Sequence, residues 1–318
     1  MKETIEELKY LAEKFDLITV LGATAGGKTS FASELAYLTD REIIGADSRQ
    51  VYKKMDIGTG KDLDDYIVRG KQIKYHLIDI LEPGYKYNVF EYQKDFVKVY
   101  NKLKSENKKA IMCGGSGLYL ESVLDSYKLL KVPENKEFRA ELEKKSLNQL
   151  AEMLKSFGKV HNTSDLLDKN RAIKAIEIAD FYKNNSDISN DLQNINSIVF
   201  GVKFDRDSRR KRITERLKQR LENGMIEEID MLIKSGVSTE TLIYYGLEYK
   251  FVTLYLLNQL SYNEMFKALE TAIHQFSKRQ MTWFRRMEKK GTKIYWLDGY
   301  LSIEDKIERV KEVLKINQ

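Results

Sequence analysis

A run of glycines and small residues near the N-terminus has the pattern of a phosphate-binding loop. Residues 22–29 read Gly-Ala-Thr-Ala-Gly-Gly-Lys-Thr and fit G-x-x-x-x-G-K-[ST]. In such a loop backbone N–H groups surround phosphate oxygens, and Lys28 adds a full positive charge. The Thr29 hydroxyl is suited to ligate Mg²⁺. The pattern alone leaves open whether the ligand is a nucleotide such as ATP or another pyrophosphate ester.

A second polar segment, Asp47-Ser48-Arg49-Gln50-Val51-Tyr52, follows the short apolar run 42–46. Asp47 could accept a proton from a nucleophile or help to hold Mg²⁺ through water. Gln50 and Tyr52 offer edge and face contacts to a planar base. The alternative is that Asp47 and Ser48 only cap the following segment. The residue types leave both interpretations open.

The elements that position these segments alternate between strand and helix. Residues 17–21, 42–46, 75–81 and 109–113 are short and apolar, as buried parallel strands are. Residues 4–14 and 28–37 have helical periodicity. This alternation predicts an α/β fold with a P-loop-type parallel sheet covered by helices. The phosphate loop and Asp47 would then lie at the carboxyl edge of the sheet, where ligands bind.

The middle of the chain predicts an all-helical insertion domain. From residue 132 to 182 the apolar residues recur at helical spacing, and eight of the fifteen residues in 183–197 are Asn or Ser, which favours a linker. Strand character returns at 197–204 and again at 293–297. We therefore expect a first core part at 1–131, the insertion at 132–196 and a second core part with basic helices at 197–318.

The composition is that of a folded globular protein and excludes several classes. The chain has 318 residues, 42% hydrophobic and 32% charged, with a net charge of +6. No stretch is apolar and long enough to span a membrane, and no signal peptide is apparent, so we expect a cytoplasmic protein. The single cysteine, Cys113, excludes an internal disulfide and a multi-cysteine metal site. A cation held by oxygen ligands remains possible.

Two predicted helices carry cationic strips. On the first, Arg209, Arg212, Arg216 and Arg220 adjoin an apolar ladder, and on the second, Lys278, Arg279, Arg285 and Arg286 lie opposite an apolar arc. Guanidinium groups facing a cleft would suit a diphosphate, and an exposed cationic face would suit nucleic acid. The alternative is a solvated helix face with apolar side-chain stems.

Taken together, the motifs resemble the tRNA dimethylallyltransferase family, also called isopentenyl-diphosphate:tRNA isopentenyltransferases. The resemblance runs from about residue 17 to residue 297, and the order and spacing of its motifs are specific. The motifs are GATAGGKT (22–29), ADSRQVY (46–52), MDIGTGK (55–61), YHLIDILEP (75–83), GGSGLYL (114–120), KNRAIKAIEI (169–178), RITERLKQRLENGMIEEI (212–229) and SKRQMTWFRR (277–286).

The resemblance implies transfer of a dimethylallyl group from its diphosphate to N6 of the adenine just 3′ of the anticodon in tRNA, with Mg²⁺ assisting at Thr29. The products would be N6-dimethylallyladenosine and diphosphate. Asp47 would be the general base, acting with Lys28 and Ser116, and the helical insertion would bind the anticodon stem. The implied diphosphate-binding residues are Gly22, Thr24, Ala25, Gly26, Gly27, Lys28, Thr29, Arg212 and Arg216. The implied tRNA-binding residues are Asp47, Ser48, Arg49, Gln50, Val51, Tyr52, Ser116, Arg171, Lys278, Arg279, Gln280 and Arg285.

Other functions stay open on the residues alone. A P-loop kinase or ATPase would explain residues 22–29 but neither the two basic helices nor GGSGLYL. A tRNA-binding module could use the loop only to sense a nucleotide, and a prenyltransferase acting on free adenine nucleotides would need no helical insertion. We expect a monomer without membrane association, and we assign no role to residues 244–250 (YYGLEYK).

Overall fold

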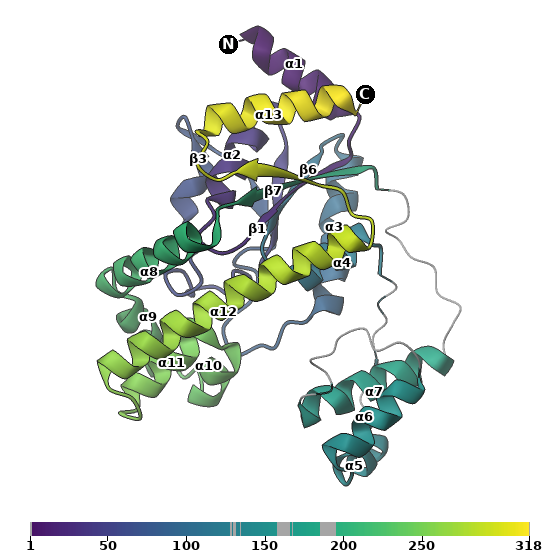
Figure 1. Cartoon of the computed structure of the whole chain (residues 1–318), viewed down its shortest axis with the longest axis vertical. Coiled ribbons are helices and arrows are strands. Elements are labelled where there is room, and N and C mark those ends of the chain that lie inside the picture. The colour runs from purple at the N-terminus through teal and green to yellow at the C-terminus, as the bar shows by residue number, and fades with distance from the viewer. Residues whose placement is uncertain are drawn as a thin grey trace. The chain divides into compact units, whose positions relative to one another are not determined.

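The structure is a computed structural model that describes residues 2–127, 129, 132–133, 135–157, 166, 168–184 and 195–317. Its centre is a six-stranded sheet of order β5-β2-β6-β1-β7-β8, in which each neighbouring pair is parallel (Figure 1). The strands are β1 (Leu17–Gly22), β2 (Glu42–Ala46), β5 (Tyr75–His76), β6 (Ala110–Gly114), β7 (Ser197–Lys203) and β8 (Ile294–Asp298). The prediction of a parallel P-loop-type α/β fold is confirmed.

The central strand β1 is buried along its whole length, as its uninterrupted apolar run requires. Alternate residues serve opposite faces of the sheet: Leu17 and Leu21 join one hydrophobic core, whereas Ile18 and Val20 join the other. In register, Gly114 at the end of β6 lies beside both Leu21 and Ala46. The carboxyl ends of β1, β2 and β6 therefore meet at one edge.

Helices cover both faces of the sheet (Figure 1). The core that contains Ile18 is closed by α1 (Lys2–Glu13), α2 (Lys28–Thr39) and α13 (Ile303–Ile316). The core that contains Leu17 is closed by α3 (Val89–Ser105), α4 (Gly117–Leu124), α8 (Arg206–Glu222), α9 (Met225–Lys234), α10 (Thr239–Tyr245), α11 (Leu247–Leu256) and α12 (Tyr262–Lys289). A 3₁₀ helix, η1 (Leu63–Tyr66), and a small antiparallel pair, β3 (Ile67–Val68) and β4 (Lys71–Gln72), complete this part.

The prediction of a strand over residues 75–81 is wrong for most of its length. Only Tyr75 and His76 pair with β2. Leu77 and Asp79 have φ of +59° and +55°, in the left-handed region that ends an extended strand. Leu77 and Ile78 are buried without a ladder, and the turn directs the Asp79 carboxylate to Lys61.

The chain divides into two compact units, Met1–Ser126 with Leu192–Gln318, and Tyr127–Asp191. The described residues of the second unit include α5 (Lys136–Glu143), α6 (Leu147–Ser156) and α7 (Lys169–Asn184), which share a core of their own formed by Leu142, Leu150, Leu154, Ala172, Ile173 and Ile176. The helical periodicity in this region therefore corresponds to helices. Residues 185–194, most of the predicted Asn/Ser linker, lie outside the described residues.

Among the described ranges, no helix combines the length and the apolar character needed to cross a membrane.

Candidate active site

The phosphate loop lies between the end of β1 and the first turn of α2, as its pattern predicts. Ala25 and Gly27 have φ of +58° and +67°, so the backbone curls in the left-handed sense over the start of the helix. Lys28 turns back into the loop, where its Nζ donates to the Ala23 carbonyl oxygen at 2.9 Å. Burial lowers the pKa of Lys28, which the charge of Asp47 partly opposes. A partly desolvated ammonium group beside the N–H donors of such a loop is a site for an anion.

The two hydroxyls that follow Lys28 differ in what they contact. Ser30 donates to Asp65 Oδ1 at 2.9 Å. Thr29 is half-buried, and its hydroxyl has no hydrogen-bond partner among the residues that the structure describes. A hydroxyl at the first turn of α2 that none of these described residues engages fits the oxygen ligand that Mg²⁺ prefers. In the same described part, no group of three or more His, Cys, Asp or Glu side chains is placed to hold a metal.

Asp47 lies directly after β2 at the same edge of the sheet. Its Oδ1 accepts from the Arg49 N–H at 2.9 Å, so the carboxylate does cap the following turn. Ser116 is next to this turn: the Ser48 N–H donates to Ser116 Oγ at 3.0 Å, and the Ser116 N–H donates to the Ala46 carbonyl oxygen at 3.2 Å. Asp47 is half-buried and reachable from solvent. The Asp47 turn is therefore bonded through Ser48 to the hydroxyl of Ser116, which precedes α4.

The close approach of β2 and β6 at this point requires glycine. A Cβ added to Gly114 would lie 2.2 Å from the Ala46 carbonyl oxygen, and one added to Gly115 would lie 2.5 Å from Gln280 Nε2. No larger residue could occupy either position without moving backbone or a buried side chain. The GGSGLYL motif therefore permits the contact between Ser116 and the Asp47 turn.

The structure contradicts the prediction that the side chain of Gln280 binds tRNA. It is 6% exposed, its Oε1 accepts from the Thr24 N–H at 2.9 Å, and its Nε2 donates to the Gly115 carbonyl oxygen at 2.9 Å. Both ends of the amide are occupied by backbone groups, so Gln280 joins the phosphate loop to the Gly115 turn. A buried amide bonded in this way is not available to read a base.

The arginine strip of α8 faces the phosphate loop. Ile213, Leu217 and Leu221 are buried beneath it, as the helical pattern predicts. Arg212 Nε donates to the Ala25 carbonyl oxygen at 3.1 Å, across a sequence separation of 187 residues. Arg216 donates to the Gly60 carbonyl oxygen at 3.3 Å and to Asp62 at 2.6 Å. The structure thus brings Arg212 to the phosphate loop and Arg216 to the neighbouring segment 60–62, both from a distant part of the sequence.

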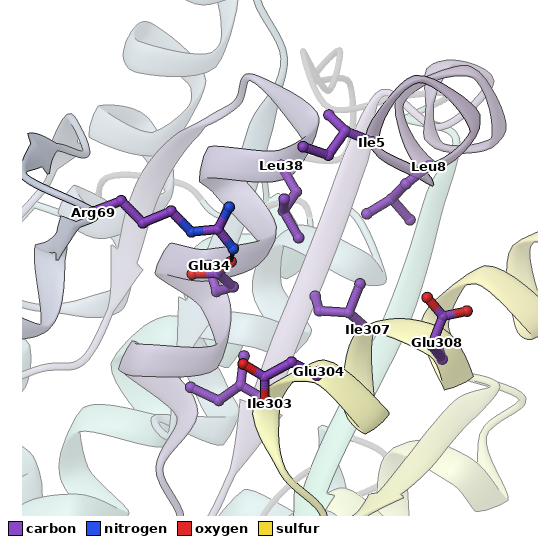
Figure 2. Close-up of a pocket in the computed structure, with 9 residues that line it drawn as sticks. All are labelled: Ile5, Leu8, Glu34, Leu38, Arg69, Ile303, Glu304, Ile307 and Glu308. Atoms are coloured by element: carbon purple, nitrogen blue, oxygen red, sulfur yellow. Dashed lines mark hydrogen bonds and ion pairs between the residues drawn. The ribbon is translucent and has the colours of Figure 1, made fainter. Parts of the chain in front are cut away.

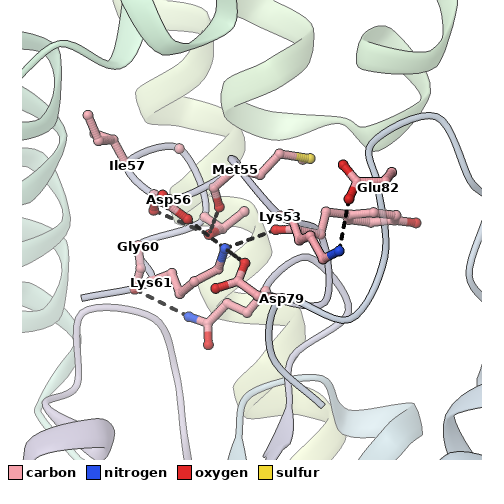
Figure 3. Close-up of polar contacts among 12 residues, drawn as sticks. Lys53, Met55, Asp56, Ile57, Gly60, Lys61, Asp79 and Glu82 are labelled. Atoms are coloured by element: carbon pink, nitrogen blue, oxygen red, sulfur yellow. Dashed lines mark hydrogen bonds and ion pairs between the residues drawn. The ribbon is translucent and has the colours of Figure 1, made fainter. Parts of the chain in front are cut away.

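The loop 55–61 (MDIGTGK) is stabilised by contacts of its own residue Lys61 (Figure 3). Lys61 is buried, and its Nζ donates to the Tyr52 carbonyl oxygen at 2.9 Å and pairs with the carboxylates of Asp56 and Asp79. The Gly60 carbonyl oxygen also accepts from Gln50 Nε2 at 3.2 Å. The loop therefore fixes the orientation of both Gln50 and Arg216.

Sequence reasoning missed the residue that anchors this loop from α9. Glu228 is 7% exposed, and its carboxylate accepts from the backbone N–H groups of residues 56, 57 and 58 at 2.8, 2.7 and 3.1 Å. It also accepts from the Tyr249 hydroxyl at 2.9 Å. The signal was present: Glu228 lies on the same helical face as Met225, Ile229 and Leu232, where a carboxylate is buried only with partners.

Residues 244–250, which had no assigned role, support the same region. The Tyr249 ring packs against Gly58, and Glu248 is buried opposite Arg220, with Nη1 to Oε1 at 3.6 Å. Desolvation raises the pKa of Glu248, and the Arg220 charge opposes that rise. Tyr245 donates to the Tyr85 carbonyl oxygen at 2.9 Å. The segment therefore packs behind the loop 55–61.

The prediction that the Tyr52 side chain contacts a base is wrong, and the side chain of Val51, predicted to bind tRNA, is buried as well. Both are 0% exposed. The Tyr52 hydroxyl donates to the Tyr85 carbonyl oxygen at 2.8 Å, and its ring centroid lies 4.6 Å from that of Tyr245. Their apolar surface belongs to the core. Ser48, Arg49 and Gln50 remain half-buried at the edge of the site.

On α12, Lys278, Arg279 and Arg285 are exposed, but Arg286 does not belong to this cationic face. Arg286 pairs with the fully buried Glu121 of α4, and its guanidinium lies 4.1 Å from the Trp283 ring centroid. Burial and then the nearby charge of Arg285 lower the pKa of Arg209 in α8. Arg209 of α8 and Arg285 of α12 are therefore close enough for their charges to interact.

Arg171 is exposed on α7, in the second unit. Its backbone N–H donates to Asp168 Oδ1 at 2.9 Å, which places the residue in the first turn of the helix.

A separate cavity of about 160 Å³ lies among α1, α2 and α13 (Figure 2). Apolar side chains of these helices line it together with Glu34, Arg69, Glu304 and Glu308. It contains none of the predicted site residues.

The fold and the site are those of a phosphate-loop α/β protein. The residues near the loop include a carboxylate (Asp47), a hydroxyl (Ser116) and two arginines (Arg212 and Arg216). The sequence profile of the IPP transferase family matches residues 50–287. tRNA dimethylallyltransferase 2 of Phocaeicola vulgatus is 56% identical over 302 residues, which cover 95% of this chain and 98% of the relative. tRNA dimethylallyltransferase 2 of Bacteroides fragilis is 54% identical over 301 residues, with coverage of 95% and 98%.

Solved structures agree. The crystal structure of the full-length tRNA isopentenylpyrophosphate transferase from Bacillus halodurans has a TM-score of 0.68 and 26% identity, covering 94% of this chain and 95% of the other. A eukaryotic dimethylallyltransferase acting on tRNA has a TM-score of 0.72 at 20% identity, covering 90% and 74%, and supports the fold alone. The chain belongs to the IPP transferase family, and it is a prenyltransferase. The resemblance noted in the sequence is confirmed.

Proposed function

We propose that this protein transfers a dimethylallyl group from dimethylallyl diphosphate to N6 of the adenine 3′-adjacent to the anticodon of tRNA. The observation that carries the proposal is the placement of Asp47 and Ser116 at the same sheet edge as the phosphate loop, with the charge of Asp47 acting on Lys28. Relatives more than half identical over nearly the whole chain are named tRNA dimethylallyltransferases, which supports the same reaction.

On the donor side, the diphosphate is the leaving group. As the allylic C–O bond breaks, negative charge grows on the diphosphate, and preorganised donors stabilise it. Lys28, the loop N–H groups and the guanidinium groups of Arg212 and Arg216 are available for that purpose. The bond from Lys28 to the Ala23 carbonyl oxygen is the internal contact that a bound phosphate oxygen would replace.

Mg²⁺ is part of the proposal, and the donor set fits it. The Thr29 hydroxyl would hold the ion next to the diphosphate, where it would neutralise charge on the leaving group. The neighbouring Ser30 is engaged by Asp65, which leaves Thr29 as the hydroxyl of this turn for the ion.

On the acceptor side, the adenine N6 lone pair is delocalised into the ring, so N6 is a weak nucleophile. When N6 attacks C1 of the dimethylallyl group, the C1–O bond breaks, diphosphate leaves with the bonding electrons, and N6 loses a proton. Asp47 is suited to take that proton, because its Oδ1 is fixed by the Arg49 N–H. The base must leave the stacked anticodon loop to reach this position.

The exposed cations of α12, Lys278, Arg279 and Arg285, are suited to phosphates of the tRNA backbone. We assign the anticodon stem to the second unit, whose α7 exposes Arg171.

The test is to incubate the purified protein with dimethylallyl diphosphate and unmodified tRNA, digest the product and locate the new mass. We expect one nucleoside heavier by a five-carbon group, at the adenine 3′ of the anticodon. Parallel reactions with AMP as acceptor and with ATP as donor separate the alternatives. Prenylated AMP, or phosphoryl transfer from ATP without prenylated adenosine, would contradict the proposal.

A further inference from the structure

One buried side chain on α12 touches both halves of the proposed site. Gln280 accepts from the Thr24 N–H and donates to the Gly115 carbonyl oxygen, each at 2.9 Å. Thr24 belongs to the phosphate loop, on the donor side. Gly115 precedes Ser116, whose Oγ accepts from the Ser48 N–H next to Asp47, on the acceptor side. A single amide therefore connects the loop that would hold the diphosphate to the Gly115 turn, which is bonded through Ser116 to the turn that carries the base.

The chemistry of the two contacts requires an amide. One end must accept a hydrogen bond from an N–H, and the other must donate one to a carbonyl oxygen, which among side chains of this length only glutamine does without charge. Gln280 is 6% exposed, so loss of either contact would leave a backbone group of an active-site loop without a partner. A bulkier residue at Gly115 would push the Gln280 amide away.

α12 holds Gln280 rigidly. The helix has 28 residues, begins with a capping box at Ser261 and is buried along one face through Ile273, Ser277, Met281 and Phe284. A group on a long packed helix is positioned more precisely than one on a loop, because neighbouring side chains limit its rotamers.

We propose that Gln280 is a positioning residue that sets the distance between the phosphate loop and the Gly115–Ser116 segment bonded to the Asp47 turn, and so aligns donor and acceptor for transfer. This inference rests on the proposed function. Since both ends of the Gln280 amide are bonded to the protein backbone, it acts on the rate of the chemical step rather than on tRNA affinity. Misplacement of reacting groups by about 1 Å can cost on the order of 100-fold in rate.

The experiment compares Gln280→Leu, Gln280→Glu and Ser277→Ala with the unchanged protein. Ser277 is the matched control: it lies one turn earlier on the same buried face, and its hydroxyl has no hydrogen-bond partner among the described residues. For Gln280→Leu we expect kcat to fall about 10- to 100-fold, with the KM for tRNA changed less than about threefold. Ser277→Ala should keep kcat within about threefold.

The Gln280→Glu variant tests the positioning role through the pH dependence of kcat, which a purely structural role of Gln280 would leave unchanged. Its carboxylate, when ionised, would still accept from the Thr24 N–H but would repel the Gly115 carbonyl oxygen, whereas the protonated carboxyl would donate to that oxygen. The ratio of its kcat to that of the unchanged protein, measured at each pH, should therefore rise as pH falls from about 8 to about 6, since burial raises a carboxyl pKa. A ratio independent of pH, or a Gln280→Leu variant with unchanged kcat, would overturn the proposal.

A third measurement does not depend on activity. Amide hydrogen exchange in peptides covering 22–29 and 113–118 should be faster in Gln280→Leu than in Ser277→Ala, because the tie between the two segments is gone. Equal exchange in both variants would count against Gln280 even if no prenyl transfer were found. Absence of transfer by the unchanged protein, together with the expected difference in exchange, would count against the proposed function alone.

Discussion

At the scale of single residues, the proposed transfer depends most on Asp47. Its Oδ1 already accepts the Arg49 N–H, and an asparagine would keep that bond while losing the ability to take a proton. Asp47→Asn should therefore lower turnover about 100-fold or more, with tRNA binding near normal. Rate and tRNA affinity are measured separately, the latter by filter binding. Asp64→Asn, which removes an exposed carboxylate from η1, is the control and should retain full activity. A fully active Asp47→Asn variant would end the assignment of the base.

The identity of the site residues could be predicted from the sequence, whereas the contacts that surround them could not. The phosphate loop, Asp47 and Ser116 follow from motifs that are local in sequence, and the structure places them at one sheet edge. Gln280 and Tyr52 were misjudged, because nothing in the pattern distinguishes a polar side chain on a surface from one bonded to distant backbone. Their partners are 256 and 33 residues away along the chain.

At the scale of elements, α9 stabilises the loop 55–61 through Glu228. Glu228→Gln keeps the size of the side chain but replaces one carboxylate oxygen by an NH₂ group that faces N–H donors. We expect a loss of about 1.5–3 kcal/mol in the free energy of unfolding, the range for hydrogen bonds to a charged group. Urea unfolding measures it. Glu227→Gln, the exposed neighbour on the same helix, should change stability by less than about 0.5 kcal/mol. Equal effects of the two substitutions would refute the anchoring role.

Most elements were predictable from periodicity, and the exceptions have physical causes. The strand at 42–46 has the predicted bounds, because a short apolar run between turns has few alternatives. The segment 75–81 leaves the sheet after His76. Leu77 and Asp79 have a left-handed backbone conformation, and the Asp79 carboxylate pairs with Lys61. A contact of this kind between distant residues cannot be predicted from the local spacing of apolar residues.

At the scale of the whole molecule, binding of tRNA should depend on the cations of α12. Charge reversal of Arg279 and Arg285 together should weaken tRNA binding and flatten its dependence on salt, because fewer counterions are released. The measurement is the slope of log Kd against log salt concentration. Reversal of Lys9 and Arg309, which are exposed on α1 and α13 at the other face of the sheet, is the matched control and should leave the slope unchanged. An unchanged slope for the α12 variant would contradict the assigned surface.

The most direct test of the account is a product balance on the unchanged protein. With dimethylallyl diphosphate, Mg²⁺ and unmodified tRNA, diphosphate release and dimethylallyladenosine formation are measured in the same samples over time. We predict one diphosphate for each modified adenosine, and no phosphate released when ATP replaces the prenyl donor. Phosphate release from ATP together with tRNA that gains no prenyl group would contradict the central claim that the phosphate loop holds an allylic diphosphate.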